Sequence, residues 1–221
     1  MNLPEGFHNE IIEAKENKLY TDVDNIKSKV DTSPLNSGGA SFKTNVLIKE
    51  SSSKILYKPS IGAAIFGFIF LAIGLGVLFF GIYPLFGNNF NLAEVEWFLL
   101  IFGLIFTTAG SFMFYMFYMP RVFDKQIGYY YKAYSPGSHY RNRRSSKSHI
   151  PLKSIIAIQL IGEHVKNDKG SYKSFELNLV LNDGSRNNVI DHGNLKSIIS
   201  DAEILSNFLN IPIWHAGSVN V

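Results

Sequence analysis

Two long stretches without a charged side chain constrain this sequence more than any other feature. Residues 61–83 and 97–119 contain no Asp, Glu, Lys, Arg or His. An α-helix rises about 1.5 Å per residue, so about 20 apolar residues cross a hydrocarbon core of roughly 30 Å. Both stretches reach that length, and together they predict a membrane α-helical hairpin at 61–119. Two core helices of a water-soluble protein are the alternative, but core helices rarely avoid charge for so long.

The charges around the two stretches predict the orientation of the hairpin. The connector at 84–96 has two Glu and no Lys or Arg. Lysine and arginine gather instead on the outer flanks of the hairpin, and such flanks stay on the cytoplasmic side. These residues are Lys43, Lys49, Lys54, Lys58, Arg121, Lys125 and Lys132. The sequence therefore predicts a multi-pass protein of the cell (inner) membrane, with the N- and C-termini in the cytoplasm.

Small residues recur along both predicted helices at regular spacing. They follow one another every seven residues in the first helix and every four in the second. Small side chains let helices approach closely in lipid, where packing holds helices together. The residues are Gly67, Gly74, Gly81, Gly103, Thr107 and Ser111. We predict a helix-packing interface here, within the hairpin, between copies or with a partner subunit. The general abundance of glycine in membrane helices is the alternative explanation.

The polar parts of the chain form four further segments. They are an N-terminal segment and linker at 1–41, strands before the membrane at 42–60, a cytoplasmic domain at 120–210 and a tail at 211–221. Within the first segment, a short helix is expected at 9–18. Ser, Gly, Pro and Asn are dense in the remainder of that segment, which is typical of a linker.

The segment after the hairpin alternates strands with turns. Phe175, Leu177, Leu179 and Leu181 occupy every second position, which predicts one buried strand face. Asp183 and Gly184 then mark a tight hairpin turn. At 194–210, apolar residues at three- and four-residue steps predict an amphipathic helix, with Asn194 as its N-cap.

The phrases RVFDKQIGYYYKAY, IPLKSIIAIQL and FELNLVLNDGSRNNVI, followed by that helix, resemble the pleckstrin-homology-like domains of many bacterial membrane proteins. The resemblance covers 120–210. It implies an α+β cytoplasmic domain, a β barrel or sandwich closed by the C-terminal helix, and a scaffold more than an enzyme. Two strands alone are marginal in water. We therefore hypothesise that the hairpin is inserted into the domain and that strands at 42–58 pair with strands after residue 120.

Catalytic and cofactor motifs are missing from the sequence. It has no cysteine, no Gly-Lys-Ser/Thr run and no His-Glu-x-x-His motif. We expect no cofactor and no metal, and the formal charge of +3 does not favour a nucleic-acid partner. Asp191 could orient His192 as a general base, or Glu163 and His164 could join His192 at a metal. A strand-to-helix turn and surface histidines are the structural alternatives.

A basic loop follows the phrase RVFDKQIGYYYKAY. Arg141, Arg143, Arg144 and Lys147 lie among Ser, Asn and Tyr140. Anionic headgroups attract such residues at about 1 kcal/mol each near a membrane surface. The four residues are candidate lipid ligands, and a solvated loop is the alternative.

These features favour a non-catalytic, membrane-anchored binding module, an accessory or scaffold subunit of a membrane protein complex. Its expected partners are membrane lipids and other subunits or a second copy of the chain. Three alternatives stay open: an anionic-lipid sensor, a pore or transporter component, and a lipid-acting enzyme. Trp214 and the residues after it are either a docking peptide or a frayed end.

Overall fold

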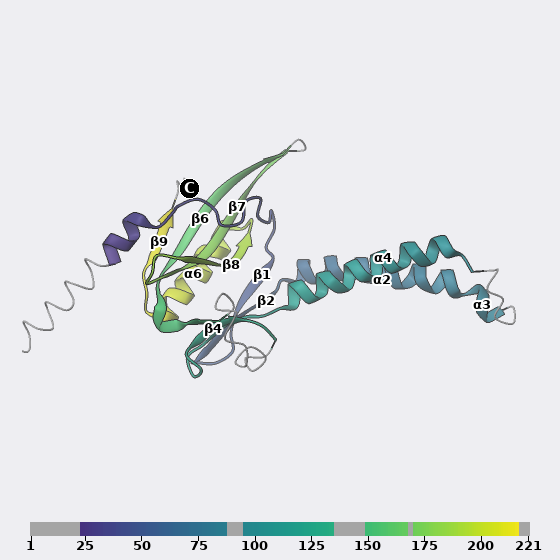
Figure 1. Cartoon of the computed structure of the whole chain (residues 1–221), viewed down its shortest axis with the longest axis horizontal. Helices are drawn as coiled ribbons and strands as arrows, with labels where there is room; N and C mark the ends of the chain where they lie inside the picture. Colours follow the sequence, from purple (N-terminus) through teal and green to yellow (C-terminus); the bar gives the residue numbers. More distant parts are fainter. Residues whose placement is uncertain (1–22, 88–94, 135–148, 168–169, 217–221) are drawn as a thin grey trace, which may run out of the picture. The chain divides into compact units, whose positions relative to one another are not determined.

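The computed structural model describes residues 23–87, 95–134, 149–167 and 170–216 (Figure 1). The chain divides into two compact units. One unit is Phe42–His149, and the other combines Met1–Ser41 with Ile150–Val221. The range 120–210, which the sequence analysis treats as one domain, contributes strands to both units.

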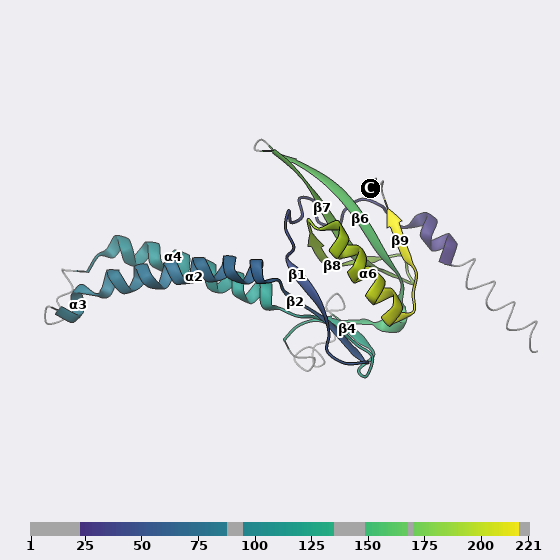
Figure 2. The ribbon, with the colours of Figure 1, turned by 180° about the vertical axis from the view of Figure 1, so that it is seen from behind.

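In the first unit, two helices form an apolar hairpin. The long helices are α2 (Ile61–Ile82) and α4 (Trp97–Tyr118), with the short α3 (Pro84–Gly87) between them. Among the described residues, the two long helices are the ones whose length and composition would allow them to cross a membrane. Their bounds agree with the two uncharged stretches to within one residue. Figures 1 and 2 show α2 and α4 side by side along their length.

The start of α2 is fixed by a serine cap. The Ser60 hydroxyl accepts the N–H of Ala63 at 3.1 Å and donates to the carbonyl of Lys43 at 2.6 Å. An N-cap serine satisfies one of the free N–H groups of the first helical turn. The helix therefore begins directly after the preceding strand, as the sequence predicts.

Strands from both sides of the hairpin form one five-stranded sheet. Its order is β1-β2-β3-β4-β5. The strands are β1 (Asn45–Lys49), β2 (Lys54–Pro59), β3 (Arg121–Asp124), β4 (Tyr129–Lys132) and β5 (His149–Pro151). β2 pairs antiparallel with β3, with Ile55 opposite Phe123. The hypothesis that strands before the hairpin pair with strands after it is therefore confirmed.

Both faces of this sheet carry buried aromatic or aliphatic side chains. Ile55, Phe123 and Tyr130 lie in register on one face, and the rings of Phe123 and Tyr130 are 4.7 Å apart. Burial raises the pKa of Tyr130 to about 12. The other face holds a cluster of Leu56, Val122, Tyr131 and Ala133. The hairpin thus connects two strands of a sheet that has buried side chains on both faces.

The second unit is built on a four-stranded sheet of order β8-β7-β6-β9. Its strands are β6 (Ile155–Asn167), β7 (Gly170–Leu181), β8 (Arg186–His192) and β9 (Ile213–Ala216). β6, β7 and β8 pair antiparallel, and β9 joins β6 in parallel. Gly184, at φ +80°, makes the predicted β7–β8 turn, where a positive φ favours glycine.

One face of this sheet is covered by α6 (Leu195–Leu209). Ile198, Ala202, Leu205 and Phe208 are buried along one side of the helix. The Asn194 side chain accepts the N–H of Ser197, so the predicted N-cap is confirmed. Figure 2 shows α6 in front of the sheet.

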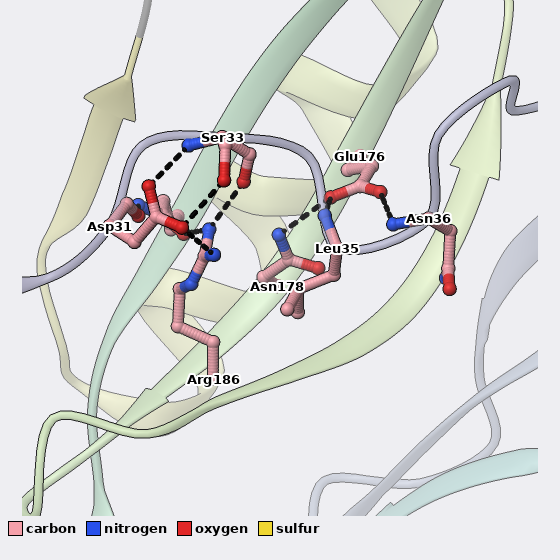
Figure 3. A network of polar contacts seen from close by, with 8 residues as sticks. Asp31, Ser33, Leu35, Asn36, Glu176, Asn178 and Arg186 are labelled. Atoms are coloured by element: carbon pink, nitrogen blue, oxygen red, sulfur yellow. Dashed lines mark hydrogen bonds and ion pairs between the residues drawn. The ribbon is translucent and has the colours of Figure 1, made fainter.

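The opposite face is covered by the N-terminal segment. Residues 23–29 are helical, and the chain then crosses the sheet in front of β6 and β7 (Figures 1 and 3). Val30 packs with Ala157, Val180 and Trp214 in a buried cluster. The prediction of a linker in this segment is therefore wrong for residues 23–30, which form a helix and a buried contact. Val23, Ile26 and Val30 are spaced for one helical face, which the dense polar residues around them mask.

The C-terminal tail also differs from the prediction of a separate tail. Residues 213–216 form β9, with Trp214 in register with Gln159 of β6. Trp214 is only 6% exposed, and the ammonium of Lys27 lies 5.8 Å from the centre of its ring. Trp214 is therefore not part of a frayed end, because it completes the cluster under the N-terminal segment.

Candidate functional site

The face of the second sheet that lies under the N-terminal segment is unusually polar. Side chains alternate between the faces of a strand. On β7, Leu177 and Leu179 point to the α6 side, while Glu176 and Asn178 point to the other. Gln159 of β6 pairs with Asn178 and shares its face. All three polar side chains are at most 2% exposed, so each needs a hydrogen-bond partner within the fold.

The Glu176 carboxylate finds its partners in the backbone of the N-terminal segment (Figure 3). Its Oε2 accepts the N–H of Leu35 at 2.9 Å, and its Oε1 accepts the N–H of Asn36 at 2.6 Å. The amide of Asn178 adds a third donor at 3.0 Å. A buried carboxylate is tolerated when several donors surround it. One side chain thus binds two successive peptide groups.

Arg186 binds the same segment at Asp31 and Ser33, a few residues before Leu35. One guanidinium nitrogen donates to the carbonyl of Ser33 at 2.7 Å and to Oε1 of Gln159 at 3.3 Å. The other nitrogen pairs with the Asp31 carboxylate at 3.1 Å. The Arg186 side chain is 7% exposed, whereas that of Asp31 is 65% exposed. Figure 3 shows Arg186 pointing from β8 to this turn of the segment.

Asp31 itself stabilises a local turn. The hydroxyl and the backbone N–H of Ser33 both donate to its carboxylate. These bonds, with a smaller contribution from the charge of Arg186, hold the pKa of Asp31 below its ordinary value of 3.8. The amide of Gln159 donates to the carbonyl of Asp31 at 3.0 Å. Asp31 is therefore bound through its main chain and its side chain.

The last contact lies toward the β6–β7 hairpin end. Both carboxylate oxygens of Glu163 accept the N–H of Gly38, at 3.1 and 3.3 Å. The Tyr172 hydroxyl donates to the carbonyl of Gly38 at 3.4 Å. We call residues 31–38 the strap. We call five sheet residues the polar seat: Gln159, Glu163, Glu176 and Arg186, which bind the strap, and Asn178, which donates to Glu176.

The candidate acid–base pair, Asp191 and His192, lies at the end of β8, and its side chains have separate hydrogen-bond partners. Asp191 and His192 are adjacent on β8, so their side chains project to opposite faces of the strand. His192 is fully buried, and its Nδ1 accepts the N–H of Asn194 at 3.2 Å. Asp191 accepts the amide of Asn188 at 2.8 Å. This geometry does not favour a pair in which Asp191 orients His192.

Two further predictions concern a metal site and the basic loop. Within the described part of the chain, no group of three His, Cys, Asp or Glu side chains is arranged to hold a metal ion. The candidate lipid ligands Arg141, Arg143, Arg144 and Lys147 lie outside the described residues.

The predicted packing residues of α2 all face α4. Gly67, Gly74 and Gly81 are buried. A Cβ atom on Gly74 would overlap the backbone nitrogen of Thr107, and one on Gly81 would lie 2.9 Å from the Leu100 side chain. At Gly67 a Cβ would only touch the ring of Phe114, at 3.6 Å. The closest approach of the helices is therefore at Gly74.

On α4 the contact follows a different spacing from the predicted one. Gly103 is buried against Leu78, and the Thr107 hydroxyl is buried beside Gly74. Ser111, however, is exposed, and Gly110 instead lies against Leu71. Within the hairpin, Gly110 rather than Ser111 therefore lies at this end of the contact. The contact continues at a seven-residue step from Gly103 to Gly110, because helices that run side by side keep one face together at that period.

The sequence did not predict the polar seat, and of its residues only Glu163 was singled out, as a candidate metal ligand. Its signal is present in the strands, where Gln159, Glu176 and Asn178 interrupt otherwise apolar runs at every second position. Polar residues inside a strand of this kind need buried partners, and that requirement points to a covering segment. The identity of that segment carries no comparable signal.

Comparisons with protein families, curated proteins and solved structures found no match for this chain. The contacts of the polar seat nevertheless define what it does chemically. Carboxylates accept main-chain N–H groups, and a guanidinium and an amide donate to main-chain carbonyls. Such a surface recognises an extended segment mainly through its backbone, with Asp31 as the main side-chain determinant.

Proposed function

We propose that this protein is a non-catalytic, membrane-anchored binding module, an accessory or scaffold subunit of a membrane protein complex. The observation that carries the proposal is the polar seat, a buried set of side chains devoted to holding an extended backbone. Binding of this kind needs no nucleophile and no cofactor.

The membrane anchor in this proposal is the α2–α4 hairpin. Large apolar side chains cover its outer surface, including Ile61 at 81%, Phe98 at 75% and Phe80 at 66% exposed. Contiguous apolar surface on this scale is not tolerated in water and marks a lipid or protein contact. In lipid, a helix also satisfies its own backbone hydrogen bonds. Together with the basic flanks, this supports a hairpin in the cell membrane with both sheets in the cytoplasm.

The resemblance to pleckstrin-homology-like domains fits the same proposal. Antiparallel strands lead to a C-terminal amphipathic helix packed on a sheet, as that resemblance implies. The resemblance implies a binding platform rather than an enzyme. We extend the proposal to a pleckstrin-homology-like arrangement on this basis.

The experiment is purification of the full-length chain in mild detergent, with mass spectrometry of co-purifying proteins and lipids. The expected result is a membrane protein in fixed ratio to the chain. Glu176→Gln tests the polar seat. Glu203→Gln, on the exposed side of α6, is its matched control. Recovery of the chain without any protein, from detergent and from lipid nanodiscs alike, would contradict the proposal. Tightly held anionic lipid in that case would support a lipid sensor instead.

A further inference from the structure

The strap is held by polar contacts and buries little of its own surface. Val30 is buried just before it, but most of residues 31–38 are exposed, and the Leu35 side chain is 40% exposed. Segments with few buried apolar contacts open more readily than the core does. The strap therefore docks through about half a dozen hydrogen bonds that water or another peptide can replace.

The polar seat, by contrast, is built into the sheet. Glu176, Asn178 and Gln159 lie on central strands and are nearly fully buried beneath the strap. Removal of the strap would leave the Glu176 carboxylate without two of its three donors. Unsatisfied buried groups are costly, so an open seat favours any segment that restores the same contacts.

We propose that the polar seat is a binding site for an extended peptide segment of a partner protein, and that the strap is its internal competitor. This inference rests on the proposed function as a binding module and names the site and the class of ligand.

The geometry of the strap defines the ligand. An acidic side chain pairs with Arg186, and the main-chain carbonyl two residues later accepts from the same guanidinium. Two successive N–H groups, four and five residues after the acid, then bind Glu176. Asp31, Ser33, Leu35 and Asn36 play these parts in the chain itself.

An internal competitor lowers the apparent affinity for the partner. The strap is tethered to its own seat, and tethered ligands act at effective concentrations that can reach the millimolar range. The apparent dissociation constant rises by the inverse of the fraction of seats that are open. A change that weakens only the strap must therefore strengthen partner binding.

The test uses the full-length chain in detergent and a labelled peptide with the sequence of residues 28–39, measured by fluorescence anisotropy. Asp31→Ala in the chain removes the Arg186 pair and the Ser33 turn and leaves the seat intact. We expect the parent to bind the peptide weakly and Asp31→Ala to bind it severalfold more tightly, because the Asp31 carboxylate is 65% exposed and water screens its pair with Arg186. A peptide in which the residue equivalent to Asp31 is replaced by Ala should not show this gain in affinity for the Asp31→Ala chain.

Arg186→Ala in the Asp31→Ala background should abolish binding, whereas Lys196→Ala, an exposed cation of α6, should leave it unchanged. Far-UV circular dichroism reports whether each variant is folded, and Asp31→Asn provides a milder substitution. A folded Asp31→Ala or Asp31→Asn chain that binds no peptide would overturn the inference, as would binding that survives Arg186→Ala. A co-purifying partner that stays bound to Arg186→Ala would overturn only the inference, since the proposed function would then rest on another surface.

Discussion

Gly74 of α2 lies directly against the backbone of Thr107 of α4, closer than any side chain at that position would permit. A Cβ atom there would overlap the Thr107 nitrogen and lie 2.6 Å from its hydroxyl oxygen. Gly76, two residues further on, has open space at the same position. The two helices therefore approach each other most closely at heptad-spaced glycines, while Phe70 of α2 and Phe106 of α4 stack across the contact at 5.6 Å.

Gly74→Ala is expected to destabilise the hairpin by about 1–3 kcal/mol, the usual cost of overpacking a close contact. Gly76→Ala is the matched control and should be nearly neutral. Helicity during denaturant titration in micelles measures both. Equal stability of the two variants would contradict the close approach of α2 and α4.

Glu176→Gln should loosen the strap. The substitution keeps the shape of the side chain but turns an N–H acceptor into a donor that faces the N–H of Leu35 or Asn36. The expected cost is about 1.5–3 kcal/mol, as for hydrogen bonds to a charged group. Amide hydrogen exchange at Leu35 and Asn36 should accelerate at least about tenfold, because every 1.4 kcal/mol is a factor of ten. Unchanged protection of the two amides would refute the part assigned to Glu176.

Docking of the strap should also depend on pH through Asp31. Its pKa is lower in the folded chain than the ordinary 3.8, chiefly because the Ser33 hydroxyl and backbone N–H bind the carboxylate. The unfolded group takes up a proton first as the pH falls. The contribution of Asp31 to stability is therefore fully present above about pH 4 and is lost as the pH falls through the lowered value.

The measurement is the difference in Trp214 emission between the parent and Asp31→Asn, both with Trp97→Phe. This difference in emission should be constant near neutral pH and should disappear below pH 4. A difference that persists at the acid end would mean that Asp31 does not act through its charge.

Trp214→Ala tests the docking of the C-terminal strand. Trp214 packs with Val30, Ala157 and Val180, so truncation leaves a cavity under the N-terminal segment. Loss of about 3–5 kcal/mol is expected for a buried aromatic residue. Thermal unfolding should shift accordingly, and protease cleavage before residue 41 should become faster. A variant as resistant as the parent would contradict the buried position of Trp214.

The elements that the sequence predicts well are those with a local signature. The helices α2, α4 and α6 follow from long uncharged or periodic runs, and the β7–β8 hairpin follows from alternation and from Asp183-Gly184. The pairing of β2 with β3 across the hairpin could be argued because two isolated strands cannot be stable. In each case the physical constraint acts between neighbours or within one element.

The strap lacked such a signature. Its contacts join residues far apart in the chain, since the N–H of Asn36 and the carboxylate of Glu176 are separated by 140 positions. The polar seat binds main-chain atoms of the strap, which every residue type has. The strap therefore needs few particular side chains, and its composition is that of an ordinary linker. β9 was missed for a similar reason, because a four-residue parallel edge strand depends on its neighbour and not on its own pattern.

We propose that the hairpin crosses the cell membrane and that the strands on both sides of it are cytoplasmic. The chain has no cysteine, so single cysteines report their own exposure. Glu96→Cys lies just before α4 on the connector side, and Ser52→Cys lies in the β1–β2 turn. With a membrane-impermeant maleimide on intact cells, we predict labelling of Glu96→Cys, and labelling of Ser52→Cys only after permeabilisation. Labelling of both positions in intact cells, or release of the protein from membranes by carbonate, would contradict the account.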